Sequence, residues 1–327
     1  MNESKNTRSS GVRSRRGVLK AAVVGAGVVA GVGGGGVARA DERRCMAPVF
    51  VLVHGAGGNS YGWAPVLAEL ALRGHRAVAV DLPGHGPGAH YPASYQAPQD
   101  LAGLRSEPSP LGKVTLADFA AHVVGVVRRA SRLGAVVLVG QSMGGATLNA
   151  VANQVPELVS HLVYASAFCP TRHASVRELM STPEASTSAL ARLDVVPTPP
   201  ELGVTRVNWR SGDPAFFAAA KEALAADWPD TAVRALLATL EPDESAEAGT
   251  ADCRGIPEKW GRVPRTFLRF TRDRTVPLAL QDLMIREADA ATPRNRFRVR
   301  SLAAPHAGPR DPAVWADELE LAAGACR

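Results

Sequence analysis

Ser142 lies in the run GQSMG, residues 140–144, which joins an apolar segment at 136–139 to a segment with helical periodicity. A Gly-x-Ser-x-Gly run is chemically meaningful where a strand turns sharply into a helix, because that turn exposes the serine hydroxyl at the helix N-terminus. Glycines are required at 140 and 144, since side chains there would crowd neighbouring backbone. This context predicts that Ser142 is a nucleophile.

A serine nucleophile needs a general base, and the base needs an acid that orients it. The chain has eight histidines, and only His306 lies beyond the last β-forming run, which ends near Leu302. That position agrees with the chain order nucleophile, acid, histidine. We therefore expect His306 to be the general base.

Asp273 is the predicted acid, because it follows the β-forming run 266–270 and precedes a helical segment. It would then lie in a loop at the carboxyl edge of a strand. Helix capping alone is the alternative role for Asp273. Three other acids compete with it: Asp252 in an inserted segment, Asp282 inside the next helix, and Asp311 placed to cap the last helix.

Short apolar, β-branched runs recur along the chain, and the first four lack polar alternation. That pattern is typical of strands buried on both faces of a parallel sheet. Helical periodicity fills the gaps between them, so we predict a doubly wound α/β sheet of about six strands. The expected strands are 49–53, 77–80, 136–139, 162–165, 266–270 and 297–299. The expected helices are 116–133, 143–154, 278–290 and 313–323.

About a hundred residues without a clear strand separate the fourth run from the fifth. Within them, 214–226 and 231–240 indicate helices, whereas 197–200 and 241–244 indicate turns. A helical insertion after the carboxyl end of a strand predicts a cap over the ligand edge, at about 167–262. The alternative is a second domain on the surface. A smaller excursion, residues 86–113, is expected to run over the same edge.

Three further motifs give the chain its resemblance to the α/β-hydrolase family. They are His54-Gly55-Ala56 after the first run, Trp63, and the segment DLPGHG at 81–86. Within the family the chain resembles the capped group of small-molecule esterases and plant-type hydroxynitrile lyases. The resemblance extends from about Val49 to Leu321 and is loose through the cap. It departs from the family around His306, where 304–309 read APHAGP and form a stiffer loop.

The resemblance implies further site residues. The backbone N–H groups of Ala56 and Met143 would form an oxyanion hole, and glycines around Ala56 would let the backbone approach the substrate. Trp63, Phe216 and Phe217 could line an acyl or alcohol pocket, or serve only as core residues.

His54 and His85 suggest a metal site, but no second ligand has suitable spacing. We expect both to stabilise loops through hydrogen bonds. No metal or other cofactor is expected.

These residues predict a carboxylic-ester hydrolase that forms an acyl-enzyme on a small to medium, mainly apolar ester or lactone. Relatives that attack with a carboxylate are excluded by Ser142. Hydroxynitrile lyases of the group typically carry Thr in the oxyanion turn and Lys after the histidine, where this chain has Gly55 and Ala307. A lyase-like activity is one alternative, and a non-catalytic ligand-binding protein on the same fold is the other.

The formal net charge of +6 comes entirely from the N-terminus. Residues 1–40 contain seven Lys or Arg and one acid, which leaves 30 basic and 30 acidic residues in the remainder. A chain with this balance is not expected to bind nucleic acid.

The same N-terminal segment has the features of an export signal. A basic stretch with SRRGVLK at 14–20, close to the twin-arginine pattern, precedes an uncharged stretch at 21–37 and Ala38-Arg39-Ala40. We expect a twin-arginine signal peptide, 1–40, removed by signal peptidase. The mature domain, 41–327, would be exported to the periplasm or beyond by the twin-arginine machinery, with no stable membrane span. The alternative is an uncleaved N-terminal anchor.

Export makes disulfides possible among the four cysteines. Three pairings exist, and the sequence does not select one. We favour Cys169–Cys253, which flank the inserted segment, and Cys45–Cys326, which would join the ends of the mature chain. Four unpaired thiols are the alternative.

Overall fold

The computed structural model describes residues 47–324, and its central element is a six-stranded parallel sheet in the order β2-β1-β3-β4-β7-β8. This confirms the predicted fold class. The strand order reverses between β1 and β3, and ligands of such sheets bind outside the carboxyl ends of the strands at that point. The strands are β1 Val49–Val53, β2 Arg76–Val80, β3 Val136–Gln141, β4 His161–Ala165, β7 Arg265–Phe270 and β8 Arg298–Leu302.

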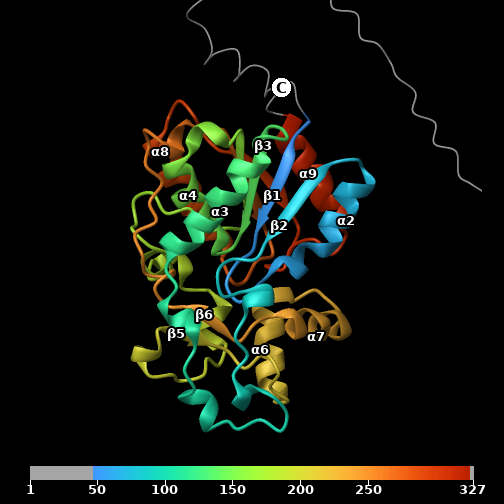
Figure 1. Cartoon of the computed structure of the whole chain (residues 1–327), viewed down its shortest axis with the longest axis vertical. Helices are drawn as coiled ribbons and strands as arrows, with labels where there is room; N and C mark the ends of the chain where they lie inside the picture. Colours follow the sequence, from blue (N-terminus) through green and yellow to red (C-terminus); the bar gives the residue numbers. More distant parts are fainter. Residues whose placement is uncertain (1–46, 325–327) are drawn as a thin grey trace, which may run out of the picture.

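Helices cover both faces of the sheet (Figure 1). One face packs against α2 and α9, and the other against α3, α4 and α8. The central strands are apolar on both faces for this reason, because each side chain meets a helix rather than water. The helices are α2 Ala64–Leu72, α3 Leu116–Ala130, α4 Gly144–Gln154, α8 Leu278–Ala291 and α9 Pro312–Gly324.

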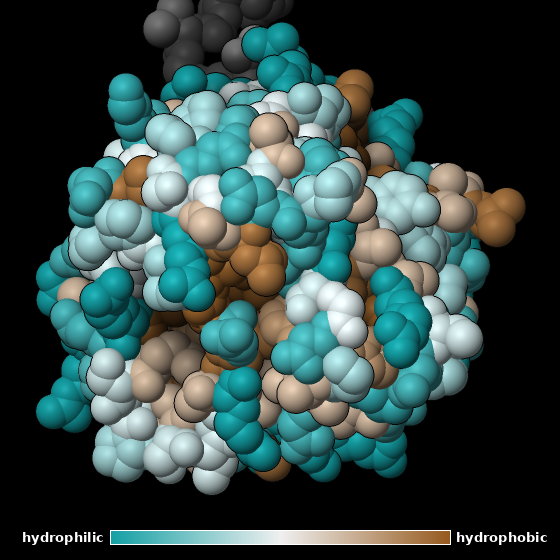
Figure 2. All heavy atoms as spheres, turned by 90° about the horizontal axis from the view of Figure 1, so that it is seen from below, coloured by the Kyte–Doolittle hydropathy of each residue, from teal (hydrophilic) through white to brown (hydrophobic). Residues whose placement is uncertain are grey.

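We call the segment between β4 and β7, residues 166–264, the cap. Most of it lies beyond the carboxyl ends of the strands, and its last residues run back along α4 to the start of β7 (Figure 1). Its helices are α5 Val176–Met180, α6 Pro214–Ala225 and α7 Asp230–Thr239. The end of the molecule that carries the cap shows apolar surface sunk among polar side chains (Figure 2).

The cap also contains two strands, so the prediction that this segment lacks strands was wrong. β5 Val204–Arg206 pairs antiparallel with β6 Asp243–Ser245, where the sequence indicated a turn at 241–244. The pair is held by a buried ion pair, in which the Arg206 guanidinium donates to both Asp243 oxygens at 2.5 and 2.8 Å. A three-residue strand stabilised by a partner elsewhere in the chain has no periodicity of its own to detect.

Arg206 also fixes the excursion at 86–113, which forms short 3₁₀ turns. Its guanidinium donates to the carbonyls of Leu104 and Glu107 at 2.7 and 2.9 Å. The excursion therefore packs against the cap. Its turns are Gly86–Gly88, Ala93–Tyr95, Gly103–Arg105 and Pro110–Lys113.

The two ends of the cap meet at one side chain of α4. The Asn149 amide donates to the carbonyls of Pro170 and Cys253, each at 2.9 Å. Its oxygen accepts from the Tyr164 hydroxyl at 2.6 Å, and that hydroxyl accepts from the Trp260 indole at 2.8 Å. Because every member is buried and bonded, this network holds the base of the cap on the core.

Cys169 and Cys253 are buried free thiols, so the predicted disulfide between them is wrong. Each thiol instead donates to its own acceptor at 3.7 Å, Cys169 to the Asn149 side chain and Cys253 to the Ala174 carbonyl. Burial raises the pKa of both thiols to about 12, which keeps them protonated at neutral pH. The predicted Cys45–Cys326 pair lies outside the described residues.

The predicted signal peptide, 1–40, also lies outside the described residues. Over 47–324, no single helix is long and apolar enough to cross a membrane. One pair of helical segments, 103–113 with 116–130, passes by length and composition but bends by 53°.

Candidate active site

Ser142 sits between β3 and α4 with a φ of +51°, a backbone conformation that few residues other than glycine adopt. A Cβ at Gly140 would approach the Leu148 side chain to 2.7 Å, and one at Gly144 would approach the His54 carbonyl to 2.7 Å. The flanking glycines are therefore required by close packing. They let the turn hold the serine hydroxyl at the start of α4.

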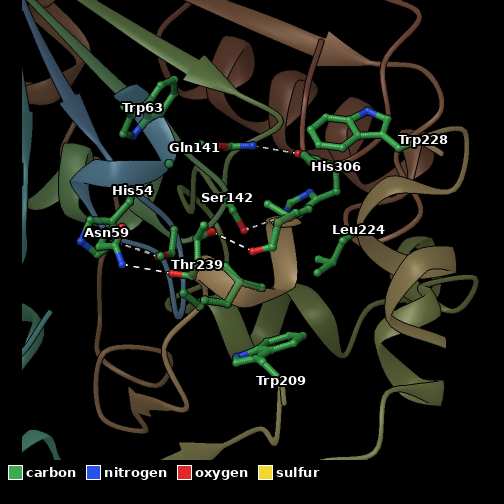
Figure 3. Close-up of a pocket in the computed structure, with 17 residues that line it drawn as sticks. His54, Asn59, Trp63, Gln141, Ser142, Trp209, Leu224, Trp228, Thr239 and His306 are labelled. Carbon is green, nitrogen blue, oxygen red and sulfur yellow. Dashed lines mark hydrogen bonds between the residues drawn. The ribbon is translucent and has the colours of Figure 1, made fainter. Parts of the chain in front are cut away.

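The structure brings Ser142, His306 and Asp273 into one hydrogen-bonded chain. His306 Nε2 lies 3.0 Å from Ser142 Oγ (Figure 3). The Nδ1 atom of His306 lies 2.7 Å from Asp273 Oδ2. The carboxylate can only accept, so Nδ1 carries the proton and Nε2 is free to accept from the serine hydroxyl. This is the tautomer that a general base requires.

The loop around His306 is held from two sides. The Gln141 amide, beside Ser142, donates to the His306 carbonyl at 2.8 Å. The Ala307 N–H donates to the Leu224 carbonyl of α6 at 2.8 Å. Core and cap therefore both orient the loop at 304–309, which contains His306 and departs from the family pattern.

Asp273 is buried and fully hydrogen-bonded. Its Oδ1 accepts from the N–H groups of Thr275 and Val276 at 2.7 and 2.8 Å, and its Oδ2 also accepts from the Ser166 hydroxyl at 2.5 Å. These donors fix the orientation of the carboxylate. Ser166, which the sequence did not indicate, is therefore part of the acid's surroundings.

The competing acids lie elsewhere in the described chain. Asp252 pairs with Arg254, and Asp282 pairs with Arg269. Asp311 caps α9 by accepting from the Ala313 N–H at 2.9 Å. The only acid that contacts His306 within residues 47–324 is Asp273.

Residues 55–58 form a tight turn, which we call the Gly55–Gly58 turn, closed by the Gly58 N–H donating to the Gly55 carbonyl at 3.1 Å. A Cβ at Gly55 would come within 2.7 Å of Ser142 Cβ, so only glycine allows this approach. Ala56 and Met143 both line a cavity with Ser142. Neither backbone N–H donates to an acceptor in the part of the chain that the structure describes.

His54 stabilises this region as a neutral side chain. The Leu82 N–H donates to His54 Nε2 at 3.1 Å, so Nδ1 carries the proton that is donated to the Gly55 carbonyl at 2.9 Å. Burial, reinforced by the neighbouring His85, lowers the pKa of His54 to about 4. Across residues 47–324, no cluster of three or more His, Cys, Asp or Glu could hold a metal ion.

Two cavities meet at Ser142 and His306. One, of about 180 Å³, lies between the core and the cap and is walled by Trp63 of the core and by Trp228 and Leu236 of the cap. Figure 3 shows Trp63 and Trp228 on the side of Ser142 and His306 opposite to Trp209. The other cavity, of about 350 Å³, extends under the cap and has mostly apolar walls with several carboxylates. Its apolar walls are Leu190, Leu193, Val195, Val207 and Leu224.

The predicted pocket residues divide between cavity and cap interior. Trp63 lines the smaller cavity. Phe216 and Phe217 line neither cavity, so their prediction needs correction: Phe216 packs beside Trp209, with ring centroids 6.1 Å apart, and Phe217 lies under the Arg234 guanidinium at 4.1 Å. The tryptophans of the cap, Trp209 and Trp228, take the lining role instead. The large indole side chains of Trp209 and Trp228 were the one signal in the sequence that could have indicated this lining role.

Known proteins similar to this chain include esterases and hydrolases. It is 38% identical over 117 residues to the esterase Rv0045c of Mycobacterium tuberculosis, covering 36% of this chain and 32% of that protein. It is 32% identical over 131 residues to a carbendazim hydrolyzing esterase of Nocardioides sp., covering 40% and 46%. The matched regions thus span less than half of either relative.

Solved structures extend the likeness over most of the chain. A pyrethroid hydrolase from Sphingobium faniae superposes with a TM-score of 0.64 at 22% identity, covering 85% of this chain and all of that one. Polyneuridine aldehyde esterase superposes with a TM-score of 0.61 at 20% identity, covering 84% and 98%. At these identities the structures show a shared fold.

The family model described as the alpha/beta hydrolase family matches residues 50–318. That range includes the six parallel strands except for Val49 of β1, together with the cap and the residues around Ser142. The chain therefore belongs to the alpha/beta hydrolase family.

Proposed function

We propose that this protein is a serine hydrolase that cleaves a small to medium, mainly apolar carboxylic ester or lactone. The observation that carries the proposal is the chain Ser142–His306–Asp273, opening into two largely apolar cavities. The similarity to proteins named as esterases supports the same reaction class.

In the first step, Ser142 Oγ attacks the ester carbonyl while its proton passes to His306 Nε2. Asp273 holds the imidazole in the required tautomer and stabilises the imidazolium that forms. The oxygen of the tetrahedral intermediate accepts hydrogen bonds from the N–H groups of Ala56 and Met143. Collapse breaks the bond to the alcohol oxygen, which takes the proton from His306 and leaves an acyl group on Ser142.

In the second step, His306 removes a proton from water as the water attacks the acyl carbonyl. The intermediate collapses, Ser142 Oγ regains its proton from His306, and the carboxylic acid departs. The cavities on either side of Ser142 would hold the acyl and alcohol parts. An apolar cavity of about 150 Å³ holds a single benzene ring, so the smaller one fits a ring or a short chain.

The test is hydrolysis of nitrophenyl esters, from acetate to long chains, by the full-length protein and by Ser142→Ala. We expect the substitution to lower kcat by about 10³-fold or more. The dependence of kcat/KM on chain length then measures the acyl cavity. A folded wild-type protein that turns over no ester would favour the ligand-binding alternative instead.

A further inference from the structure

The Gly55–Gly58 turn is tied to the cap on both sides of Gly57. The Gly57 N–H donates to Glu244 Oε2 at 2.9 Å, and the Gly57 carbonyl accepts from the Glu241 N–H at 2.8 Å. Glu241 and Glu244 come from the segment that forms β6. A cap strand therefore contacts the turn that carries Ala56.

A turn of this kind leaves two central N–H groups without a partner inside the turn. Here they belong to Ala56 and Gly57. Glu244 accepts the second, and the first donates to no acceptor within residues 47–324. Gly57 has a φ of +61° and no Cβ, so its own backbone does little to resist rotation of the Ala56–Gly57 peptide, which adjoins the Gly55–Ala56 peptide that carries the Ala56 N–H. An outside acceptor is needed to keep the Ala56 N–H in one direction.

We propose that Glu244 is a positioning residue, which holds the Gly55–Gly58 turn so that the Ala56 N–H faces the oxyanion formed on Ser142. This inference rests on the proposed ester hydrolysis. It assigns to the cap a part in the chemical step, beyond forming the walls of the cavities.

The surroundings of Glu244 suit this role. The side chain is 11% exposed, and its other oxygen accepts from the Ser245 N–H at 2.9 Å. The His85 ring faces it, with Nε2 3.3 Å from Oε2. Hydrogen bonds to a buried carboxylate are about twice as strong as neutral ones, so the Gly57 N–H is firmly held.

A second contact braces the same region. Glu241 Oε1 accepts from the Asn59 amide and from the Gly86 N–H, each at 2.8 Å. This carboxylate joins the segments after β1 and β2 to the cap. It does not bond the turn itself, so it supports the position of Glu244 without replacing it.

Glu247 offers a matched control. It is also a cap carboxylate that accepts from a core backbone N–H, that of Leu116 at 2.7 Å, but it acts at the start of α3. It lines neither cavity at Ser142 within the described residues. Removing it should loosen the cap to a similar degree and leave the turn in place.

The experiment compares full-length Glu244→Ala, Glu244→Asp, Glu244→Gln and Glu247→Ala on a nitrophenyl ester that the wild-type protein hydrolyses. For Glu244→Ala we expect kcat to fall about 10- to 100-fold with KM changed less than threefold, because a misplaced oxyanion donor affects the transition state. Glu244→Asp keeps the charge opposite His85 but withdraws it by one methylene, and should lose nearly as much. Glu244→Gln keeps an acceptor oxygen and should retain most activity. Glu247→Ala should stay within twofold of the wild type.

The second measurement is inhibition by an alkyl trifluoromethyl ketone, which adds to the serine and places an oxyanion in the hole. Its affinity should fall in parallel with kcat in Glu244→Ala and Glu244→Asp. Equal losses in the Glu244 and Glu247 variants, or a loss confined to KM with unchanged inhibitor affinity, would overturn the positioning role. If Glu244→Ala does not fold, Glu244→Asp alone decides. A wild-type protein without Ser142-dependent hydrolysis would instead overturn the proposed function, and this inference with it.

Discussion

The core sheet and the cap are stabilised by different kinds of contact. In the core, β1 and the first five residues of β3 are apolar and wholly buried, and the central strands pair in parallel register. The cap pair β5 and β6 buries the charged residues Arg206, Asp243 and Glu244. Apolar packing tolerates many similar side chains, whereas a buried charge depends on its partner.

This difference separates two contributions to the site. The core presents Ser142, Asp273 and His306 from loops that follow its strands. The cap supplies the walls of the cavities and the acceptors that orient the Gly55–Gly58 turn. Changes at these three core residues should therefore affect the chemical step at constant stability, and changes at the buried charges that join β5 to β6 should affect stability first.

The largest expected effect is that of Asp273→Asn in the core. The Asn oxygen can still accept from the Thr275 and Val276 N–H groups, so the loop should persist. The amide nitrogen would face His306 Nδ1 and favour the wrong tautomer, which lowers kcat by about 10⁴-fold in a comparable triad. Kinetics together with thermal unfolding would test this. A drop in kcat below tenfold, or one that parallels lost stability, would contradict the assignment of the acid.

The next effect is that of Arg206→Met in the cap. The substitution leaves the Asp243 carboxylate buried without its partner, which typically costs about 3–5 kcal/mol. Urea unfolding and limited proteolysis would measure the loss, and cleavage should concentrate in the cap. Adding Asp243→Leu should restore much of the stability, since no charge then remains unpaired. A loss under about 1 kcal/mol would show that the charged pair is dispensable.

The smallest effect concerns acid stability in the core. Burial, with the nearby Arg298, lowers the pKa of His161 in β4 to about 4. The unfolded chain then binds the proton more readily, so His161 makes the native state lose stability as pH falls from about 6.5 toward 4. Between pH 7 and pH 4.5, His161→Asn should lose about 2 kcal/mol less than the wild type in urea unfolding. Equal losses in both would indicate that other groups dominate.

His85 differs from His161 in the pH dependence of its contribution to stability, because it lies where the core meets the cap and faces a cap carboxylate. Burial alone would lower its pKa, but the facing Glu244 carboxylate outweighs burial and the pKa is raised. Its contribution to stability is therefore present at low pH and is lost as pH rises through its folded pKa. The sign is opposite to that of His161.

The sequence predicted the core well because the signals there are local. An apolar run, a tight turn and a helical period within about twenty residues are enough to place Ser142 between β3 and α4. In the cap, the helix expected at 214–226 is also found, as α6, Pro214–Ala225, because a helical period is a local signal as well.

The cap resisted prediction because its decisive contacts join distant segments. Arg206 and Asp243 are 37 positions apart, and Gly57 and Glu244 are 187 apart. No periodicity links such residues. Phe216 and Phe217 show the same limit, because a helical period indicates burial without showing whether the neighbour is a cavity or another side chain.

Asn149 has a consequence for how this protein could change over evolution. One amide group binds the carbonyls at both ends of the cap, so the inserted segment is closed at its base on a core helix. The entropy of closing a loop grows only slowly with its length. A lineage could therefore lengthen, shorten or exchange the chain between Pro170 and Cys253 at small cost to the sheet. The scaffold would keep its reactive serine while acquiring a new range of substrates.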